Sequence, residues 1–207
     1  MIRELPIKTG VSILVAAAAG VCCLPAVAQQ PIPAPVLKPF ADNRDWVLME
    51  NLIYQIGQTS TVIVVPKGFV TDFASIPQAF WSFGLSAHGR YSKAAIVHDY
   101  LYWTQGCSRE QADNLLMIAM KESSVDTGQR IAIYEGVRLG GGQPWLNNAD
   151  ERQKGMIRIV PEAALGFGPE VVWRDYRPTL PASVVTEIEL VAAPAYCLFG
   201  NSTDVPG

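Results

Sequence analysis

Two apolar stretches rich in β-branched residues predict a β-hairpin early in the chain. Residues 46–56 (WVLMENLIYQI) and 59–65 (TSTVIVV) carry the residue types that favour strands. The pair Gly57-Gln58 between them fits a tight hairpin turn. The second stretch ends at Pro66, and the Pro-Lys-Gly sequence there predicts a turn at the end of the strand.

The next regular pattern predicts a helix over Tyr91–Trp103 (YSKAAIVHDYLYW), which ends near Gln105-Gly106. A second helix follows after a short connection, because Ser108 and Gln111 have the spacing of a capping box. Its predicted buried stripe consists of Ala112, Leu115, Leu116, Ala119 and Met120. The short connection makes these two helices antiparallel neighbours.

A third helix is predicted to begin at the cap Asp126 and to run to about Leu139, where the glycines 140–142 stop it. After Trp145 the signals weaken, and only 156–160 and 184–193 resemble strands. We therefore expect an α+β fold, in which a small antiparallel sheet or hairpin packs on a bundle of three helices. The predicted core spans residues 46–145, and 146–207 form a C-terminal extension of strands and loops beside it.

The first residues read as a targeting segment. Residues 1–28 combine a basic start, a short apolar run and an Ala-Val-Ala end, which predicts a signal peptide cleaved after Ala28. A membrane anchor is the alternative, but the apolar run is shorter than the roughly 20 residues that a span needs. We expect an exported protein, periplasmic or secreted, with no stable membrane span after cleavage. Residues 29–45 are rich in proline and are interpreted as a stiff linker.

Charge and cysteine content narrow the picture further. The net charge is −3 and basic residues form no run, so nucleic acid is not an expected partner. After loss of the leader only Cys107 and Cys197 remain. In an exported chain two cysteines indicate either one disulfide or two free thiols; we predict that they pair, which would link the C-terminal tail to the connection between the first two helices.

The candidate chemistry centres on the adjacent pair His98-Asp99. Histidine is the natural base near neutral pH, and the neighbouring carboxylate points about 100° round the helix. Asp113, early in the second helix, is expected to reach Tyr102 or His98 across the hairpin. Asp72 is either a structural cap or a site carboxylate. Ser75 is a weaker candidate, because it lacks the glycine-flanked elbow of a nucleophilic serine.

Three blocks of sequence, PKGFVTDFASIP, YSKAAIVHDYLY and SREQADNLLMIAM, resemble in this order the domain-of-unknown-function family 1353 of bacteria, tailed phages and prophages. The resemblance covers about residues 65–145 and implies no activity. Gln78 stands where a basic residue is expected. The positions that the resemblance marks as typical are Gly68, Asp72, Ser75, Pro77, His98, Asp99, Tyr102 and Asp113.

A second, local resemblance concerns HDYLY, which is similar to the HDxxY spacing of the secreted calcium-dependent phospholipases. It implies a histidine base, an aspartate that binds calcium, and a second aspartate that orients the histidine. This chain lacks the glycine-rich calcium loop and the paired cysteines of that family.

Two classes of function remain open. In the first, the protein is a cell-envelope hydrolase that cleaves an ester, an amide or a peptidoglycan bond. His98, Asp113 and Tyr102 are then the catalytic candidates, and Asp99 and Asp72 the ligands of a divalent cation. In the second, the protein is a non-catalytic envelope or phage-derived interaction module, with peptidoglycan, lipid or a protein as partner. The same His, Asp and Tyr side chains would then form a buried network that fixes the packing.

Overall fold

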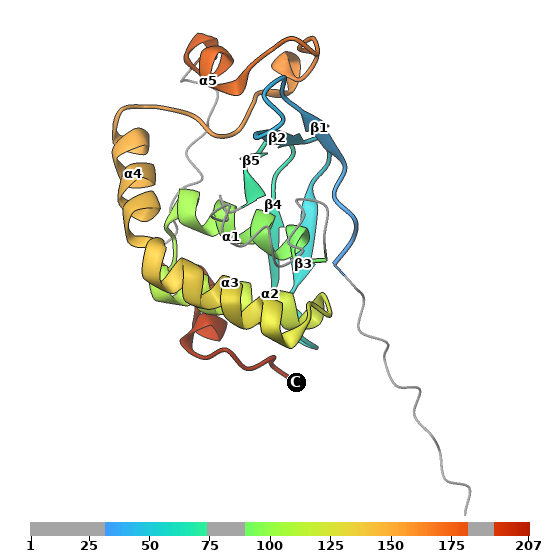
Figure 1. Ribbon diagram of the computed structural model, residues 1–207, viewed down its shortest axis with the longest axis vertical. Coiled ribbons are helices and arrows are strands. Elements are labelled where there is room, and N and C mark those ends of the chain that lie inside the picture. The colour runs from blue at the N-terminus through green and yellow to red at the C-terminus, as the bar shows by residue number, and fades with distance from the viewer. Residues whose placement is uncertain (1–31, 74–89, 182–192) are drawn as a thin grey trace, which may run out of the picture.

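The computed structural model describes residues 32–73, 90–181 and 193–207. It is an α+β fold, as predicted, in which helix α1 (Ser92–Thr104) lies between small sheets and further helices (Figure 1). Strands β4 and β5 contact α1 on one side, α2 (Arg109–Glu122) packs along it, and α4 (Gly142–Gln153) contacts it as well. No helix of the described residues is long and apolar enough to span a bilayer.

The predicted hairpin is present, but its first strand is shorter than expected. Strands β3 (Leu52–Gln55) and β4 (Val62–Val65) pair antiparallel, and a bond from Thr59 N to Ile56 O closes the turn over Gly57-Gln58. Alternate side chains of both strands are buried. Residues 46–56 do not form one strand, because β2 (Trp46–Leu48) belongs to a separate sheet.

That separate sheet corrects the interpretation of 29–45 as a linker. Strand β1 (Leu37–Pro39) pairs with β2, which in turn pairs with β5 (Val70–Thr71). Within the predicted linker, Ile32 and Phe40 are buried. Proline is compatible with β1 because this strand lies at the edge of its sheet, where one row of backbone donors needs no partner.

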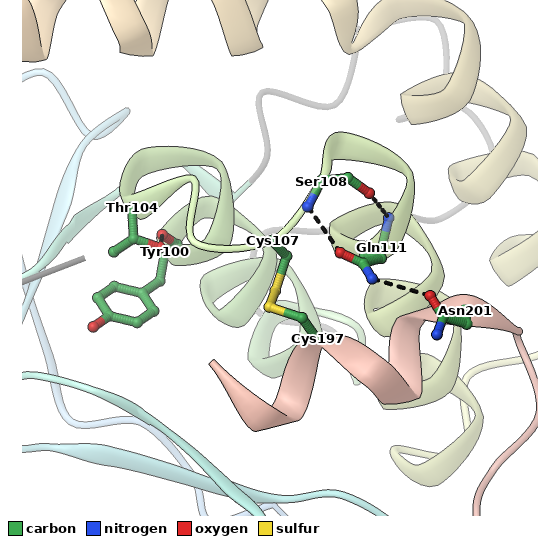
Figure 2. The surroundings of a disulfide bond; sticks show 7 residues. All are labelled: Tyr100, Thr104, Cys107, Ser108, Gln111, Cys197 and Asn201. Atoms are coloured by element: carbon green, nitrogen blue, oxygen red, sulfur yellow. Dashed lines mark hydrogen bonds between the residues drawn. A yellow bond between two sulfur atoms is a disulfide. The ribbon is translucent and has the colours of Figure 1, made fainter. Parts of the chain in front are cut away.

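The helix hairpin follows the sequence closely. Helix α2 carries the predicted capping box between Ser108 and Gln111, and its predicted stripe is buried. Cys107 and Cys197 form the predicted disulfide, with Cα atoms 5.3 Å apart. Figure 2 shows that this bond holds the 3₁₀ helix η6 (Ala195–Asn201) against the start of α2, where Gln111 also donates to Asn201.

The C-terminal half departs from the prediction. Helix α3 (Thr127–Gly140) begins at its Asp126 cap and ends in the glycine run as expected, but α4 follows at once. The sequence GGGQP reads as a breaker, yet proline is tolerated in the first turn of a helix, where its missing N–H would have no partner. Residues 156–160 form only one bridge, Phe69 to Ile159, instead of a strand. The predicted strand at 184–193 lies almost wholly outside the described residues.

The segment after α4 nevertheless packs tightly on the strands of the predicted core, residues 46–145. Val160 N donates to Gly68 O, and Val70 N donates to Arg158 O. Gly68 has a φ of +86°, and a Cβ there would lie 2.2 Å from Val160 O, so only glycine fits this crossing. Beyond it, η3 (Glu162–Ala164), α5 (Trp173–Tyr176) and η4 (Arg177–Thr179) cover a second apolar cluster around Phe40, Val47 and Trp173.

Candidate active site

A cleft of about 530 Å³ lies where α1, α3, α4 and the C-terminal segment meet. Four of the predicted site residues line it: Asp72, His98, Asp99 and Tyr102. The fifth, Asp113, is fully buried, behind His98 and Tyr102. Ser75 lies outside the described residues. The tertiary structure thus gathers at one cleft three residues of the first predicted helix and one that follows a strand, with Asp113 of the second helix behind them.

Asp113 organises the polar groups at the floor of this cleft. Its Oδ1 lies 3.0 Å from Nε2 of His98 and accepts a hydrogen bond of 2.6 Å from the Tyr102 hydroxyl. Its Oδ2 accepts a bond of 3.2 Å from Arg109, which stands four residues earlier on α2. These distances confirm that Asp113 reaches both partners across the hairpin. Since both oxygens are paired and Arg109 brings an opposite charge, the carboxylate tolerates complete burial.

The contact with Asp113 also assigns the two nitrogens of the imidazole. An ionised carboxylate only accepts hydrogen bonds, so the neutral ring must carry its proton on Nε2, which leaves a lone pair at Nδ1. His98 is 3% exposed, and within the described part of the chain Nδ1 has no hydrogen-bond partner. A buried nitrogen without a partner costs roughly 1–3 kcal/mol, which is a reason to look for a role in binding or catalysis.

Tyr102 is held in place as a donor. Burial first, and then its hydrogen bond to Asp113, raise the pKa of the Tyr102 hydroxyl above its ordinary value, so that it remains protonated. Its ring lies 4.1 Å from that of His98 and meets Trp145 edge-on at 5.1 Å. At the elbow between α3 and α4, a Cβ on Gly141 would lie 2.3 Å from the Tyr102 hydroxyl, so any larger residue would displace this ring.

Asp99 and Asp72 lie in the same cleft but are already engaged. Asp99 accepts a bond of 2.5 Å from the Thr71 hydroxyl, and its charge, after burial, helps to raise the pKa of Tyr91 to about 12. Asp72 forms an ion pair of 3.3 Å with Arg158. Among the described residues, no group of three or more His, Cys, Asp or Glu side chains is arranged to hold a metal. Cation binding by Asp99 and Asp72 stays a prediction.

Several residues of the cleft were missed by sequence reasoning. Asp45 lies in the segment interpreted as a linker, and Glu151, Arg158 and Arg177 lie where the signals were weak. Burial first, and then the negative charges of Asp72 and Asp42, raise the pKa of Asp45 to about 6. No local pattern marks these residues, because each enters the cleft only through packing of the C-terminal segment on the core.

The comparisons with known proteins cover the middle of the chain. Residues 46–137 match the family model described as "Protein of unknown function (DUF1353)". The uncharacterized protein y4jT of Sinorhizobium fredii (strain NBRC 101917 / NGR234) is 35% identical over 78 residues, which is 37% of this chain and 23% of that protein. The match thus spans about a quarter of the length of this relative. No solved structure matches the chain significantly. The chain therefore carries a DUF1353 region at residues 46–137, which confirms the family resemblance predicted from its three sequence blocks.

Proposed function

We propose that the protein is a hydrolase in which His98 is the general base. One observation carries this proposal: His98 lines the cleft with Nδ1 unpartnered in the described structure, while Nε2 is held by Asp113. A base whose second nitrogen is fixed by a buried carboxylate is oriented to take a proton at the first. The non-catalytic network predicts an imidazole with both nitrogens hydrogen-bonded. The unpartnered Nδ1 therefore favours the catalytic interpretation.

Each neighbour then has a defined task. Asp113 fixes the tautomer of His98 and stabilises the imidazolium that forms when Nδ1 takes a proton from water. Tyr102 and Arg109 hold the Asp113 carboxylate in position and offset its charge. The water oxygen attacks an ester, amide or peptidoglycan bond in the cleft, that bond breaks, and the imidazolium gives its proton to the leaving group. Asp99 and Asp72 are the proposed anchors for a divalent cation, although such an ion at Asp72 must compete with Arg158.

We also propose that the protein acts in the cell envelope after export. The disulfide supports this localisation, because such bonds persist mainly in oxidising compartments. The N-terminal sequence has the composition of a signal peptide, and mass spectrometry of the exported protein should find Gln29 as its first residue. An exported protein that still begins at Met1 would contradict the proposal.

The test of the base is the change His98→Ala. We expect hydrolysis of a p-nitrophenyl ester, or release of soluble fragments from purified peptidoglycan, to fall by about 10²- to 10⁴-fold. The free energy of unfolding should stay within about 1 kcal/mol, because Tyr102 and Arg109 still satisfy Asp113. The control is Lys154→Met, which removes only an exposed ion pair.

Two results would contradict this function. Parent protein without activity on either probe argues against a hydrolase of these bonds, and unchanged activity in His98→Ala argues against the base. A loss of several kcal/mol in His98→Ala, with an inactive parent, favours the non-catalytic network instead.

A further inference from the structure

Arg177 also lines the cleft, and it carries a second nitrogen without a partner in the described structure. The Arg177 side chain is 11% exposed and is fixed by several contacts. Nε donates to Ile157 O at 2.5 Å and Nη1 to Glu151 at 2.7 Å. The guanidinium also lies over the rings of Trp103 and Trp173, at 5.4 and 5.7 Å from their centroids. Yet its buried Nη2 has no hydrogen-bond partner within the described residues.

The other arginine of the cleft shows what a purely structural role looks like. Arg158 is similarly buried, but all three of its nitrogens are occupied: Nε by Val70 O, Nη1 by Asn148 and Nη2 by Asp72. A guanidinium offers five N–H groups in a fixed fork, so an arginine held on three sides presents its remaining donors in a set direction. Arg177 is therefore a pre-positioned donor, whereas Arg158 has no spare nitrogen.

The charges of the cleft indicate which kind of ligand group can accept a hydrogen bond from Arg177 Nη2. Four carboxylates line the cleft against two arginines, and the arginines are already paired with Asp72 and Glu151. The Asp45 side chain forms no hydrogen bond or ion pair within the described ranges, and burial first, then the negative charges of Asp72 and Asp42, raise its pKa to about 6. An anionic ligand would add to this excess of negative charge. A neutral group that both accepts and donates hydrogen bonds is favoured, because carboxylates only accept.

We propose that the wall formed by α4 and the C-terminal segment, together with Asp45 directly before β2, is a sugar subsite, in which Arg177 Nη2 donates to a hydroxyl or amide oxygen and Asp45 accepts from a hydroxyl. Hydroxyl groups supply both donor and acceptor, and Trp173, which also lines the cleft, contributes apolar lining next to Arg177. This rests on the proposed function in one respect, that the sugar flanks the bond hydrolysed at His98. It identifies the substrate as a neutral glycan, the chemistry of peptidoglycan strands.

Binding of tri-N-acetylchitotriose, measured by isothermal titration calorimetry, tests the subsite. We expect the parent to bind this neutral trisaccharide, and Arg177→Lys to bind it about tenfold more weakly or worse, because lysine can keep the contact with Glu151 but not the second donor. Arg174→Met is the matched control, since Arg174 lies three residues away and its side chain is 84% exposed. Its affinity should equal that of the parent.

The same titration in His98→Ala separates this inference from the proposed function. Binding there should persist, because the variant lacks the base but keeps the subsite. The inference is overturned if the parent does not bind the trisaccharide, if Arg177→Lys binds it like the parent, or if inorganic phosphate binds in its place. Arg177→Met is a second variant that removes the charge as well, and circular dichroism confirms its fold before titration.

Discussion

The floor and the outer wall of the cleft are built in different ways. The floor is the α1–α2 hairpin, where Asp113 is completely buried and satisfied by side chains of the same hairpin. The wall is α4 with the C-terminal segment, where Glu151, Arg158 and Arg177 form partly exposed ion pairs. The floor lies within the matched region 46–137, and the wall lies outside it. The proposed base therefore belongs to the DUF1353 region, and the proposed ligand selection to the extension.

The two parts are joined by a strip of backbone and by direct contacts of α4 with α1, where Asn148 donates to Tyr102 O and Arg152 to Thr104 O. Residues 68–70 exchange backbone hydrogen bonds with residues 158–160, and Arg158 reaches across this strip to Asp72. Because Asp113 is satisfied within the α1–α2 hairpin itself, we expect a change in the wall to disturb the floor less than a change in the floor disturbs the core. Changes at three positions test this difference, both in the size of the effect on the free energy of unfolding and in the region that it reaches.

The largest effect is expected at the floor. Asp113→Ala leaves His98, Tyr102 and Arg109 without their shared partner, and should lower the free energy of unfolding by about 3–5 kcal/mol. Chemical denaturation measures it. The control Asp126→Ala removes an exposed cap of α3 and should cost about 1 kcal/mol. Equal losses in the two variants would show that the buried network contributes little.

A smaller and more local effect is expected at the wall. Arg158→Met removes three hydrogen bonds and should cost about 1–3 kcal/mol, because Asp72 and Asn148 lose a partner at a partly buried site. Hydrogen exchange should accelerate at residues 68–70 and 158–160 and remain slow in α1 and α2. Loss of protection throughout α1 would contradict the separation of wall and floor. The exposed Arg174→Met should stay within about 0.5 kcal/mol of the parent.

The smallest effect is expected at Asp45, another residue of the cleft lining, and has the opposite sign. In the folded protein the pKa of Asp45 is raised from 3.8 to about 6 by burial and by Asp72 and Asp42, so its stabilising contribution is lost as the pH rises through this range. Asp45→Asn should therefore raise the free energy of unfolding by about 1 kcal/mol near pH 8, after allowance for partial exposure. The gain should vanish below about pH 4.

Denaturation curves of Asp45→Asn at several pH values give this profile directly. Asp150→Asn serves as control, because Asp150 is exposed and pairs only with Lys154 at the surface. A gain of the same size at every pH would show that the carboxylate of Asp45 is not the cause.

The sequence by itself determined the local features of the molecule. Ser108 and Gln111 fix the start of α2, Asp126 caps α3, and Gly57-Gln58 forms the hairpin turn. These predictions hold because caps and turns depend on residues a few positions apart. The pairing of Cys107 with Cys197 also follows from the sequence, since two cysteines remain after the predicted leader. The contact of Asp113 with His98 and Tyr102 needed only the short connection between two predicted helices.

Only the tertiary structure decided how deeply the site residues are buried and which side chains contact them. Helix α1 is buried almost all round, so its polar residues take partners from other segments, such as Thr71 for Asp99. The edge strand β1, helix α4 and the wall with Arg158 and Arg177 left no local signal. Their positions depend on burial of apolar surface between segments more than a hundred residues apart, such as those of Phe40 and Trp173. Contacts of this kind produce no periodic pattern along the sequence.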